Sequence, residues 1–237
     1  MKKQLLRVLA VILMVILLLT CVTSAAYAWW WWWPPIPPSP PPDITEDFEW
    51  GYDTCSLEDC SANWEVVGPY TGESWAEIDD DVRHGDTGRS AQFYRDGSKN
   101  VYAYYETDTS ELSDICFYVK RASTEVYVDF RCGDGDHCIW VRIMSDGRLR
   151  WYDYPQWHTV DVDDLDNLDK WYKIEFKNID WNGNPDDTFD IYVDDDLEEE
   201  GAIMHLHGGF DEGFYFENLS PSSGSFWIDD IVCSLEQ

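Results

Sequence analysis

Four carboxylates near the two ends of the folded region could form a metal site. Asp47 and Glu49 open that region, and the adjacent pair Asp229 and Asp230 lies in its last apolar segment. The first and last strands of an all-β sandwich usually pair, which would bring the four side chains together. Carboxylates gathered beside backbone carbonyls are the hard oxygen ligands that calcium prefers. The sequence therefore predicts a calcium ion that ties the chain ends.

Three further patterns place metal ligands at short spacing. They are the alternating oxygen groups Asp180, Asn182, Asn184 and Asp186, the pair Asp134 and Asp136, and the imidazoles His205 and His207. The first is not an EF-hand, because Pro185 and Ile191 stand where that loop needs Gly and Glu. An ordinary turn or strand is the alternative for each pattern.

Aromatic residues occupy positions where strands normally carry polar side chains. Flat rings offer hydrophobic contact to the faces of sugars, and clusters of exposed rings usually mark a binding surface. The alternative is that these rings pack under loops or against a second sheet. The predicted carbohydrate-binding residues are Tyr118, Tyr127, Trp140, Trp151, Trp157 and Trp171.

The elements that must position these side chains are strands. Apolar and polar residues alternate with period two around 115–119, 126–130, 139–143, 172–176, 189–193 and 214–216. Ser145-Asp-Gly147 is a hairpin signal, and no long segment keeps a helical period. Turns recur every 8–12 residues or so, which is typical of sandwiches. The predicted fold is all-β, an antiparallel two-sheet jelly-roll sandwich.

The N-terminal segment indicates export. Residues 1–28 have a basic start, an apolar core and an Ala26-Tyr-Ala28 pattern typical of a cleaved signal peptide. An uncleaved membrane anchor is the alternative, favoured by the run Trp29 to Trp33, because Trp suits the membrane interface. The rest of segment 29–42 is Pro-rich and would form a semi-rigid stalk. The sandwich is expected over 43–237, in a secreted or surface-anchored protein.

The charge of the chain excludes one class of partner. With 16 Lys and Arg against 47 Asp and Glu, the formal net charge is −31. Nucleic-acid binding needs a basic surface, so nucleic acid is not expected as a partner. Such a charge suits high salt or abundant divalent cations.

Six cysteines remain beyond the signal segment, and an even number in an exported chain favours disulfides. Short loops favour the pairs Cys55–Cys60 and Cys132–Cys138, which leaves Cys116–Cys233. Zinc binding is the competitor, but there is no Cys-x-x-Cys pair.

Three segments resemble the concanavalin A-like lectin and glucanase jelly rolls, including laminin-G-like modules. These segments are Trp171–Phe176, Thr188–Asp194 and Phe226–Ile231, and the resemblance covers roughly residues 45–235. One departure is Asp195-Asp196, where the family often has Gly. Galactose-binding-like sandwiches are the second choice. The resemblance implies a glycan or cell-surface polysaccharide as the partner.

An enzyme is the less favoured interpretation. Glu77, Asp79 and Asp81 resemble the ExDxE strand of jelly-roll glucanases, but the third carboxylate is Asp and the motif comes early. His158 near Tyr152 and Tyr154 could abstract a proton in a lyase. The sequence therefore favours a non-catalytic, lectin-like module, stabilised by calcium. A surface adhesion protein that binds protein partners, or a polysaccharide hydrolase or lyase, is the alternative.

Overall fold

The computed structural model describes residues 44–49, 55–61, 63–67, 74–85, 88–96, 100–107, 112–123, 127–133, 138–160, 162, 165–183, 186–205 and 213–235, without the side chains of Cys60, Val67 and Leu235. The predicted signal segment 1–28 and stalk 29–42 lie outside these residues. Contacts join residues 41–237 into one compact unit. Within the described part, no helix has the length and apolar character needed to cross a membrane.

The described elements are almost all strands, as the period-two patterns predict. In chain order they are β1 (Ile44–Glu46), α2 (Leu57–Cys60), β2 (Trp64–Val67), β3 (Trp75–Asp79), β4 (Ser90–Arg95), β5 (Val101–Glu106), β6 (Leu112–Arg121), β7 (Val128–Gly133), β8 (Cys138–Ile143), β9 (Leu149–Asp153), β10 (Gln156–Val160), β11 (Tyr172–Asp180), β12 (Thr188–Val193), β13 (Asp196–Ile203), β14 (Gly213–Asn218) and β15 (Gly224–Leu235).

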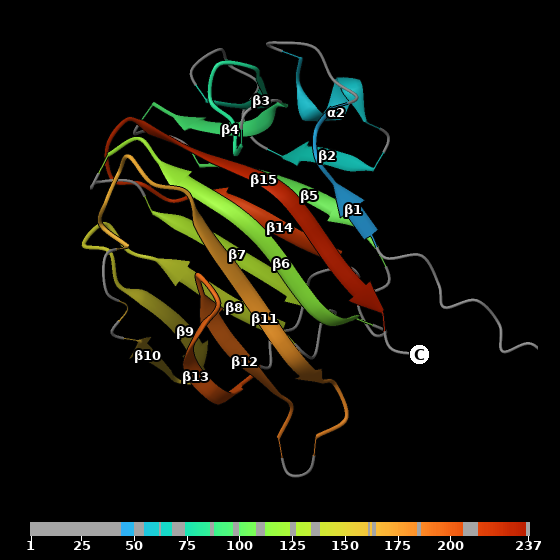
Figure 1. Ribbon diagram of the computed structural model, residues 1–237, viewed down its shortest axis with the longest axis vertical. Helices are drawn as coiled ribbons and strands as arrows, with labels where there is room; N and C mark the ends of the chain where they lie inside the picture. Colours follow the sequence, from blue (N-terminus) through green and yellow to red (C-terminus); the bar gives the residue numbers. More distant parts are fainter. Residues whose placement is uncertain are drawn as a thin grey trace, which may run out of the picture. The chain divides into compact units, whose positions relative to one another are not determined.

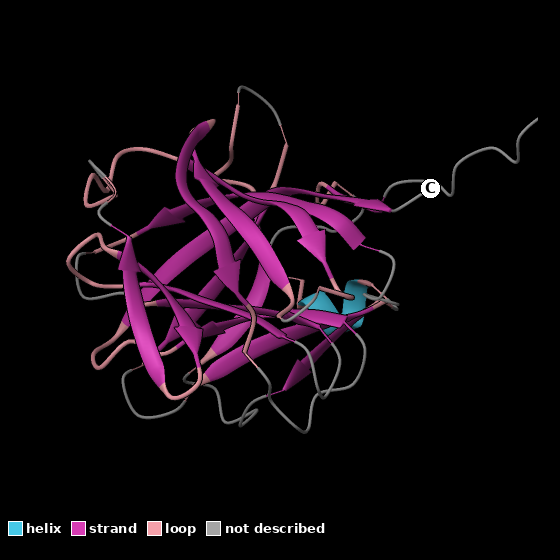
Figure 2. Cartoon of the chain, turned by 90° about the horizontal axis from the view of Figure 1, so that it is seen from below, coloured by secondary structure: helices cyan, strands magenta, loops and turns pink. Residues whose placement is uncertain are grey.

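These strands form two antiparallel sheets (Figures 1 and 2). The eight-stranded sheet has the order β13-β12-β11-β6-β15-β4-β3, with β1 paired to β15. The seven-stranded sheet has the order β10-β9-β8-β7-β14-β5-β2 and lies behind the first in Figure 1. Because strands that are neighbours in sequence often fall in different sheets, the connections cross between layers. The predicted fold, an antiparallel jelly-roll sandwich, is confirmed.

The core between the sheets is rich in phenylalanine. Phe117 and Phe176 from the eight-stranded sheet pack against Phe130 and Phe216 from the other, with ring centroids 4.9–5.2 Å apart for Phe117–Phe216, Phe117–Phe130 and Phe130–Phe176. Each ring is at most 2% exposed. Burial of one such side chain contributes about 1.5–3 kcal/mol, so this cluster is a main source of stability.

Two tight turns set the register of neighbouring hairpins. Gly147 between β8 and β9 has φ +82°, and a Cβ there would lie 2.8 Å from the backbone nitrogen of Asp166. Between β12 and β13, Asp194 and Asp195 have φ of 52° and 73°, and Val193 pairs directly with Asp196. A two-residue turn with positive φ at both positions suits a hairpin, and Asp tolerates it. The tight turn therefore forms without the family glycine.

Two of the predicted disulfides are wrong. Cys116 and Cys132 are free thiols. Cys132 and Cys233 point into the core, whereas Cys138 lies on the Trp140 side of β8 and Cys116 lies on the outer side of β6. The predicted partners thus face opposite sides of their sheet, which a short loop cannot correct. The side chain of Cys60 lies outside the described residues, so Cys55–Cys60 stays a prediction.

Candidate functional site

The outer face of the seven-stranded sheet carries side chains in rows that run across its strands. Alternation buries Phe130 and turns Asp129 and Arg131 of β7 outward. On β8 the same alternation turns Trp140 and Arg142 outward. Arg131 stands opposite Trp140, and Asp129 stands opposite Arg142. Since facing residues on neighbouring strands are in contact range, this register builds continuous rows.

We call the two rows the polar row and the aromatic row. From β10 through β9, β8, β7 and β14 to β5, the polar row consists of Thr159, Arg150, Arg142, Asp129, Glu217 and Tyr102. In the same order, the aromatic row consists of Trp157, Tyr152, Trp140, Arg131, Tyr215 and Tyr104. Strands lie about 4.8 Å apart, so each row is roughly 24 Å long.

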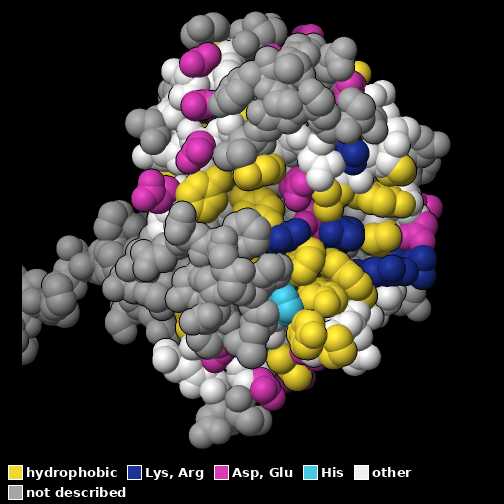
Figure 3. All heavy atoms as spheres, turned by 180° about the vertical axis from the view of Figure 1, so that it is seen from behind, with side chains coloured by type: hydrophobic (Ala, Val, Ile, Leu, Met, Phe, Trp, Pro, Cys, Tyr) yellow, Lys and Arg dark blue, Asp and Glu magenta, His cyan; other side chains and the backbone are white. Residues whose placement is uncertain are grey.

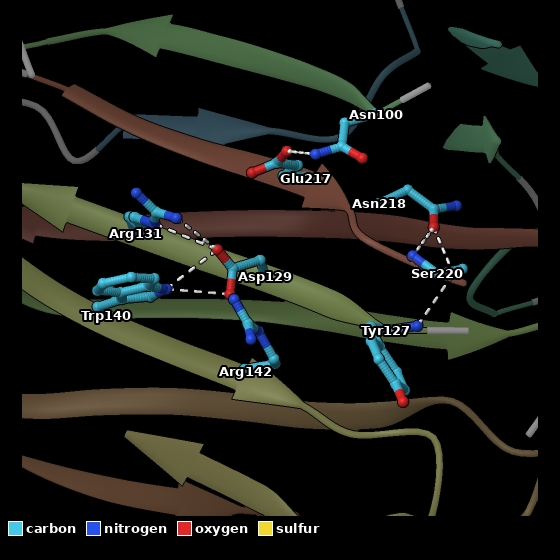
Figure 4. Close-up of polar contacts among 9 residues, drawn as sticks. All are labelled: Asn100, Tyr127, Asp129, Arg131, Trp140, Arg142, Glu217, Asn218 and Ser220. Atoms are coloured by element: carbon cyan, nitrogen blue, oxygen red, sulfur yellow. Dashed lines mark hydrogen bonds and ion pairs between the residues drawn. The ribbon is translucent and has the colours of Figure 1, made fainter. Parts of the chain in front are cut away.

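Asp129 is the centre of a buried charge network (Figure 4). Its carboxylate accepts hydrogen bonds from Arg142 Nε at 2.8 Å, from Arg131 Nε at 3.1 Å, and from Trp140 Nε1 at 3.0 Å to both oxygens. The Asp129 side chain has no exposed surface, while those of Arg131 and Arg142 are 13% and 21% exposed. A buried carboxylate is tolerated only when it is fully paired, and here several donors converge on it. Asp129 therefore fixes the positions of three outward-facing side chains.

The aromatic row is a packed group of rings. Trp140 lies 4.8 Å from Tyr152 and 5.1 Å from Trp157, measured between ring centroids. The guanidinium of Arg131 stacks 3.8 Å from the centre of the Trp140 ring, and that of Arg142 lies 4.7 Å from the Trp157 ring. These cation–π contacts hold rings and guanidinium groups in a fixed relative orientation.

The part of the face over β14 and β5 is less basic. Glu217 stands opposite Asp129 and accepts a 2.7 Å hydrogen bond from Asn100 Nδ2 (Figure 4). Burial, and then the negative charge of Asp129, raise the pKa of Glu217. Burial also raises the pKa of Tyr102 and of Tyr215, so both phenols keep their O–H groups. This end of the rows therefore offers phenol and carboxyl groups for hydrogen bonding.

Figure 3 views the molecule from the side of this sheet. Basic side chains lie close together on the face, with hydrophobic side chains on both sides of them. In a chain with a net charge of −31, a face with clustered arginines and rings is distinct from an ordinary acidic surface.

The six predicted aromatic residues fall into three places. Trp140 and Trp157 are in contact within the aromatic row. Tyr127 directly precedes β7 and alternates onto the same side as Asp129, and its backbone N–H donates to Ser220 Oγ at 3.1 Å. Half of the predicted set thus lies on the seven-stranded face.

Trp151 corrects the prediction, because it points into the core. It is 7% exposed and belongs to the buried hydrophobic cluster, with its ring stacked 4.6 Å from that of His158. Its neighbour Tyr152 takes the outward position instead. His158 also pairs with Asp153 at 3.5 Å, so it lies on the inner side of the β9–β10 hairpin, away from Tyr152.

Tyr118 and Trp171 belong to the other sheet. Both rings pack against His84, with centroid distances of 3.6 Å for Tyr118 and 5.9 Å for Trp171. Tyr118 lies on the outer side of β6 and Trp171 directly precedes β11. These two residues do not extend the aromatic row.

The four terminal carboxylates are drawn toward one end of the eight-stranded sheet by the pairing of β1 with β15. Asp229 is 3% exposed and accepts a 3.0 Å hydrogen bond from the backbone N–H of His84. His84 Nδ1 lies 2.8 Å from Asp230 Oδ2. Burial raises the pKa of Asp229 to about 7, and the charges of Asp230 and Glu49 add to the rise. Asp230 has φ 47° at an irregularity in the pairing of β15 with β6.

The donor set around Asp229 is incomplete. Glu49 Oε1 accepts the Arg89 N–H at 2.8 Å, and Asp47 Oδ1 accepts the Glu49 N–H at 3.2 Å. Among the described residues, no three His, Cys, Asp or Glu side chains are arranged to hold a metal ion. Calcium at these carboxylates stays a prediction.

The remaining candidate sites lie elsewhere or in turns. Asp180 Oδ1 accepts the Asn182 N–H at 2.9 Å, while 134–137, 184–185 and His207 lie outside the described residues. His205 is buried, 4.5 Å from the Tyr152 ring. Asp79 on β3 of the eight-stranded sheet accepts bonds from Asp81 N–H and Trp227 Nε1. The glucanase-like carboxylates therefore do not face the two rows.

The sequence-based reasoning missed the charged half of the site. Asp129 and Arg131 alternate with core residues as Tyr127 does, and Arg142 alternates as Trp140 does. That signal was present, but a charged residue on an outer strand position is usually solvated. What distinguishes these residues is their mutual pairing, which depends on the register of β7 with β8.

Comparisons with known proteins agree on the fold. No protein-family model matches the chain, and no curated protein matches it significantly. A prokaryotic β-1,3-1,4-glucanase (lichenase) derived from a mouse hindgut metagenome is similar in structure, with TM-score 0.50, 12% identity, and coverage of 81% of this chain and 99% of that one. A Bacillus subtilis protein with a galectin-like fold has TM-score 0.50, 7% identity, and coverage of 84% and 99%. The chain thus has the concanavalin A-like jelly-roll fold.

Proposed function

We propose that this protein is an exported carbohydrate-binding protein, and that a polysaccharide chain lies along the aromatic and polar rows without being cleaved. The observation that carries the proposal is the pairing of an extended row of rings with a row of fixed hydrogen-bonding groups on one face. Rings contact the apolar faces of sugars, and polar groups select among their hydroxyls. A flat row across six strands suits an extended chain better than a single small sugar.

The side chains of the two rows are held in place before any ligand arrives. Asp129 fixes Arg131, Arg142 and Trp140 through hydrogen bonds of 2.8–3.1 Å. Trp140 in turn packs against Trp157. Binding to a pre-organised surface loses less side-chain entropy, so a modest number of sugar contacts is sufficient for useful affinity.

A binding role fits the carboxylates better than hydrolysis does. Glycosidases usually place two usable carboxyl groups on either side of the bond that breaks. Glu217, with its raised pKa, has the property of a general acid. Asp129 opposite it is wholly buried and occupied by three side chains, so it offers no lone pair to a sugar or a water molecule. Release of reducing ends or unsaturated products from a bound polysaccharide would contradict the non-catalytic proposal.

Binding to a panel of polysaccharides tests the proposal directly. Trp140→Ala and Trp157→Ala should each weaken binding of the polysaccharide ligand by about 30-fold, because a truncated aromatic anchor costs about 2 kcal/mol. Trp171→Ala is the matched control, since that ring lies on the eight-stranded sheet. Calorimetry measures the polysaccharide affinity of the three variants and so shows which of the two sheets binds the ligand. If Trp171→Ala removes binding and Trp140→Ala does not, the proposed face is wrong.

A protein partner is the remaining alternative for this face. An adhesion surface would also contain rings and arginines, which are enriched where proteins meet. A competition experiment separates the two proposals. If the protein binds carbohydrate, a soluble polysaccharide should release it from a surface coated with that glycan. If the protein binds a protein partner, the soluble polysaccharide should leave that complex intact.

A further inference from the structure

The arginines that face outward on the seven-stranded sheet are concentrated on neighbouring strands, two of them in the polar row and one in the aromatic row. Arg131, Arg142 and Arg150 occupy three consecutive strands, β7, β8 and β9. Arg142 stands directly opposite Arg150. Like charges in facing positions repel each other, so this pair lowers stability unless an anion lies beside it.

Few carboxylates on this face balance the arginines. Asp129 is shared by Arg131 and Arg142, so among the ion pairs of the described residues two guanidinium groups share one carboxylate. Arg150 interacts at longer range with Asp146, but Asp146 is paired with Arg148 at the hairpin end. Glu217 on β14, together with the exposed Glu65 on β2, belongs to the opposite end of the rows. The face is therefore basic over β7–β9 and acidic toward β2.

The donors of this arginine pair are incompletely used. The described contacts of Arg142 with Asp129 engage its Nε. The Nε atom of Arg150 is buried and has no hydrogen-bond partner. A guanidinium carries five N–H donors in a planar fork, and buried donors are normally satisfied. An oxyanion held by the terminal nitrogens of the two guanidinium groups would relieve their repulsion.

We propose that the ligand of this face is an anionic polysaccharide, and that Arg142 and Arg150 bind its acidic substituents while the aromatic row holds its sugar rings. This inference rests on the proposed function and adds the class of glycan. Planar carboxylates of uronic acids match the guanidinium fork in a bidentate manner. Sulfate groups share the oxyanion chemistry and are distinguished by experiment. The acidic surface elsewhere would repel such a polymer, so binding is confined to this face and oriented along it.

The test compares a polyuronate with the same polymer after its carboxyl groups are reduced to alcohols. The polyuronate should bind at least tenfold more tightly than the reduced polymer. A rise in salt concentration should weaken binding of the polyuronate but not binding of the reduced polymer. Arg150→Gln should remove most of this preference, because it should weaken binding of the polyuronate far more than binding of the reduced polymer. Arg142→Gln should also lower the preference, but it should weaken binding of both polymers because Arg142 also supports Asp129, so Arg150→Gln is the cleaner variant.

Arg95→Gln is the matched control. Arg95 on β4 of the eight-stranded sheet also has a buried Nε without a hydrogen-bond partner, so it tests whether any such arginine matters. A sulfated polymer is the further probe. If it binds more tightly than the polyuronate and Arg150→Gln removes this advantage, the arginines recognise an oxyanion and the natural acidic substituent is sulfate.

The outcomes separate the two proposals. Equal or tighter binding of the reduced polymer, still lost in Trp140→Ala, overturns the anionic assignment and keeps carbohydrate binding. Loss of the preference in Arg95→Gln but not in Arg150→Gln also overturns it. If no polymer binds, or if Trp140→Ala binds as the unmodified chain does, the proposed function itself fails.

Discussion

The two outer faces of the sandwich use similar residues in different ways. On the eight-stranded face, Glu175 lies between Lys173 and Lys177, with N–O distances of 3.0 and 2.9 Å, and Lys173 also pairs with Asp195. On the seven-stranded face, two arginines share Asp129 and a third stands beside them. In the described ion pairs, the two lysines of the first face meet two carboxylates, whereas the two arginines of the second share one. We therefore assign the proposed binding surface to the face on which rings lie beside arginines that share one carboxylate.

The two faces should differ most, in stability and in binding, when the central carboxylate of each one is removed. Asp129→Ala should lower the free energy of unfolding by about 3–5 kcal/mol, because it leaves buried guanidinium groups without their partner. It should also abolish polysaccharide binding, since Trp140 and both arginines lose their anchor. Chemical unfolding in urea measures the first effect and calorimetry the second.

Glu175→Ala is the matched substitution on the eight-stranded face. Glu175 is 5% exposed, but its lysine partners have flexible stems that can turn their ammonium groups into water. A loss of stability clearly below that of Asp129→Ala is expected, with binding intact. Equal losses for the two substitutions would remove the contrast between the faces.

Two tryptophans of one hairpin sharpen the same comparison. Trp151→Ala should cost about 3–5 kcal/mol of stability, because it opens a cavity in the core. Trp157→Ala should cost much less stability and act mainly on binding, since the ring is half-buried on the outer face. Thermal unfolding and calorimetry on both variants give the two readouts. If Trp151→Ala is stable but binds the polysaccharide more weakly, the Trp151 ring belongs to the binding face and its assignment to the core is wrong.

Trp151 and Trp157 also show what the sequence could and could not reveal. The alternating pattern predicted the strands and the fold class, because the period of side chains along a strand is local. Successive residues of a strand point to opposite faces, so a shift of one residue moves a side chain from the surface to the core. In the segment 151–158 both faces carry aromatic rings, so the pattern did not show which ring is buried. Trp151 was therefore predicted on the outer face, although it lies in the core. Cys132 was paired with Cys138 because the loop between them is short, and loop length does not show which face of the sheet each side chain occupies.

Assignment to a sheet is a non-local property. Tyr118 and Trp140 occupy equivalent polar positions in their strands, yet β6 and β8 lie in different sheets. No local pattern separates them, because strand order is set by pairings between distant segments such as β7 with β14. The network around Asp129 was missed for this reason, since it requires the registers of β7 and β8 to be known together.

Calcium would alter the eight-stranded face alone. If the terminal carboxylates bind calcium, the ion at 100 times its Kd should add about 2.7 kcal/mol to the free energy of unfolding. Chelation should then lower Tm, calcium should restore it, and Asp230→Asn should abolish the response. Asp146→Asn in the β8–β9 hairpin is the control. An unchanged Tm on chelation, together with intact stability of Asp230→Asn, would remove the terminal site from consideration.

The smallest effect expected is a pH dependence that belongs to the seven-stranded face. Burial and the negative charge of Asp129 raise the pKa of Glu217 above its usual value of 4.5. The folded state then binds the Glu217 proton more tightly than the unfolded state does. Its contribution to stability is full below the unfolded pKa and falls as pH rises through the folded pKa. Glu217→Gln should remove this part of the decline when urea unfolding is compared across the mildly acidic range. If the variant keeps the whole decline, another group titrates, and the raised pKa assigned to Glu217 is wrong.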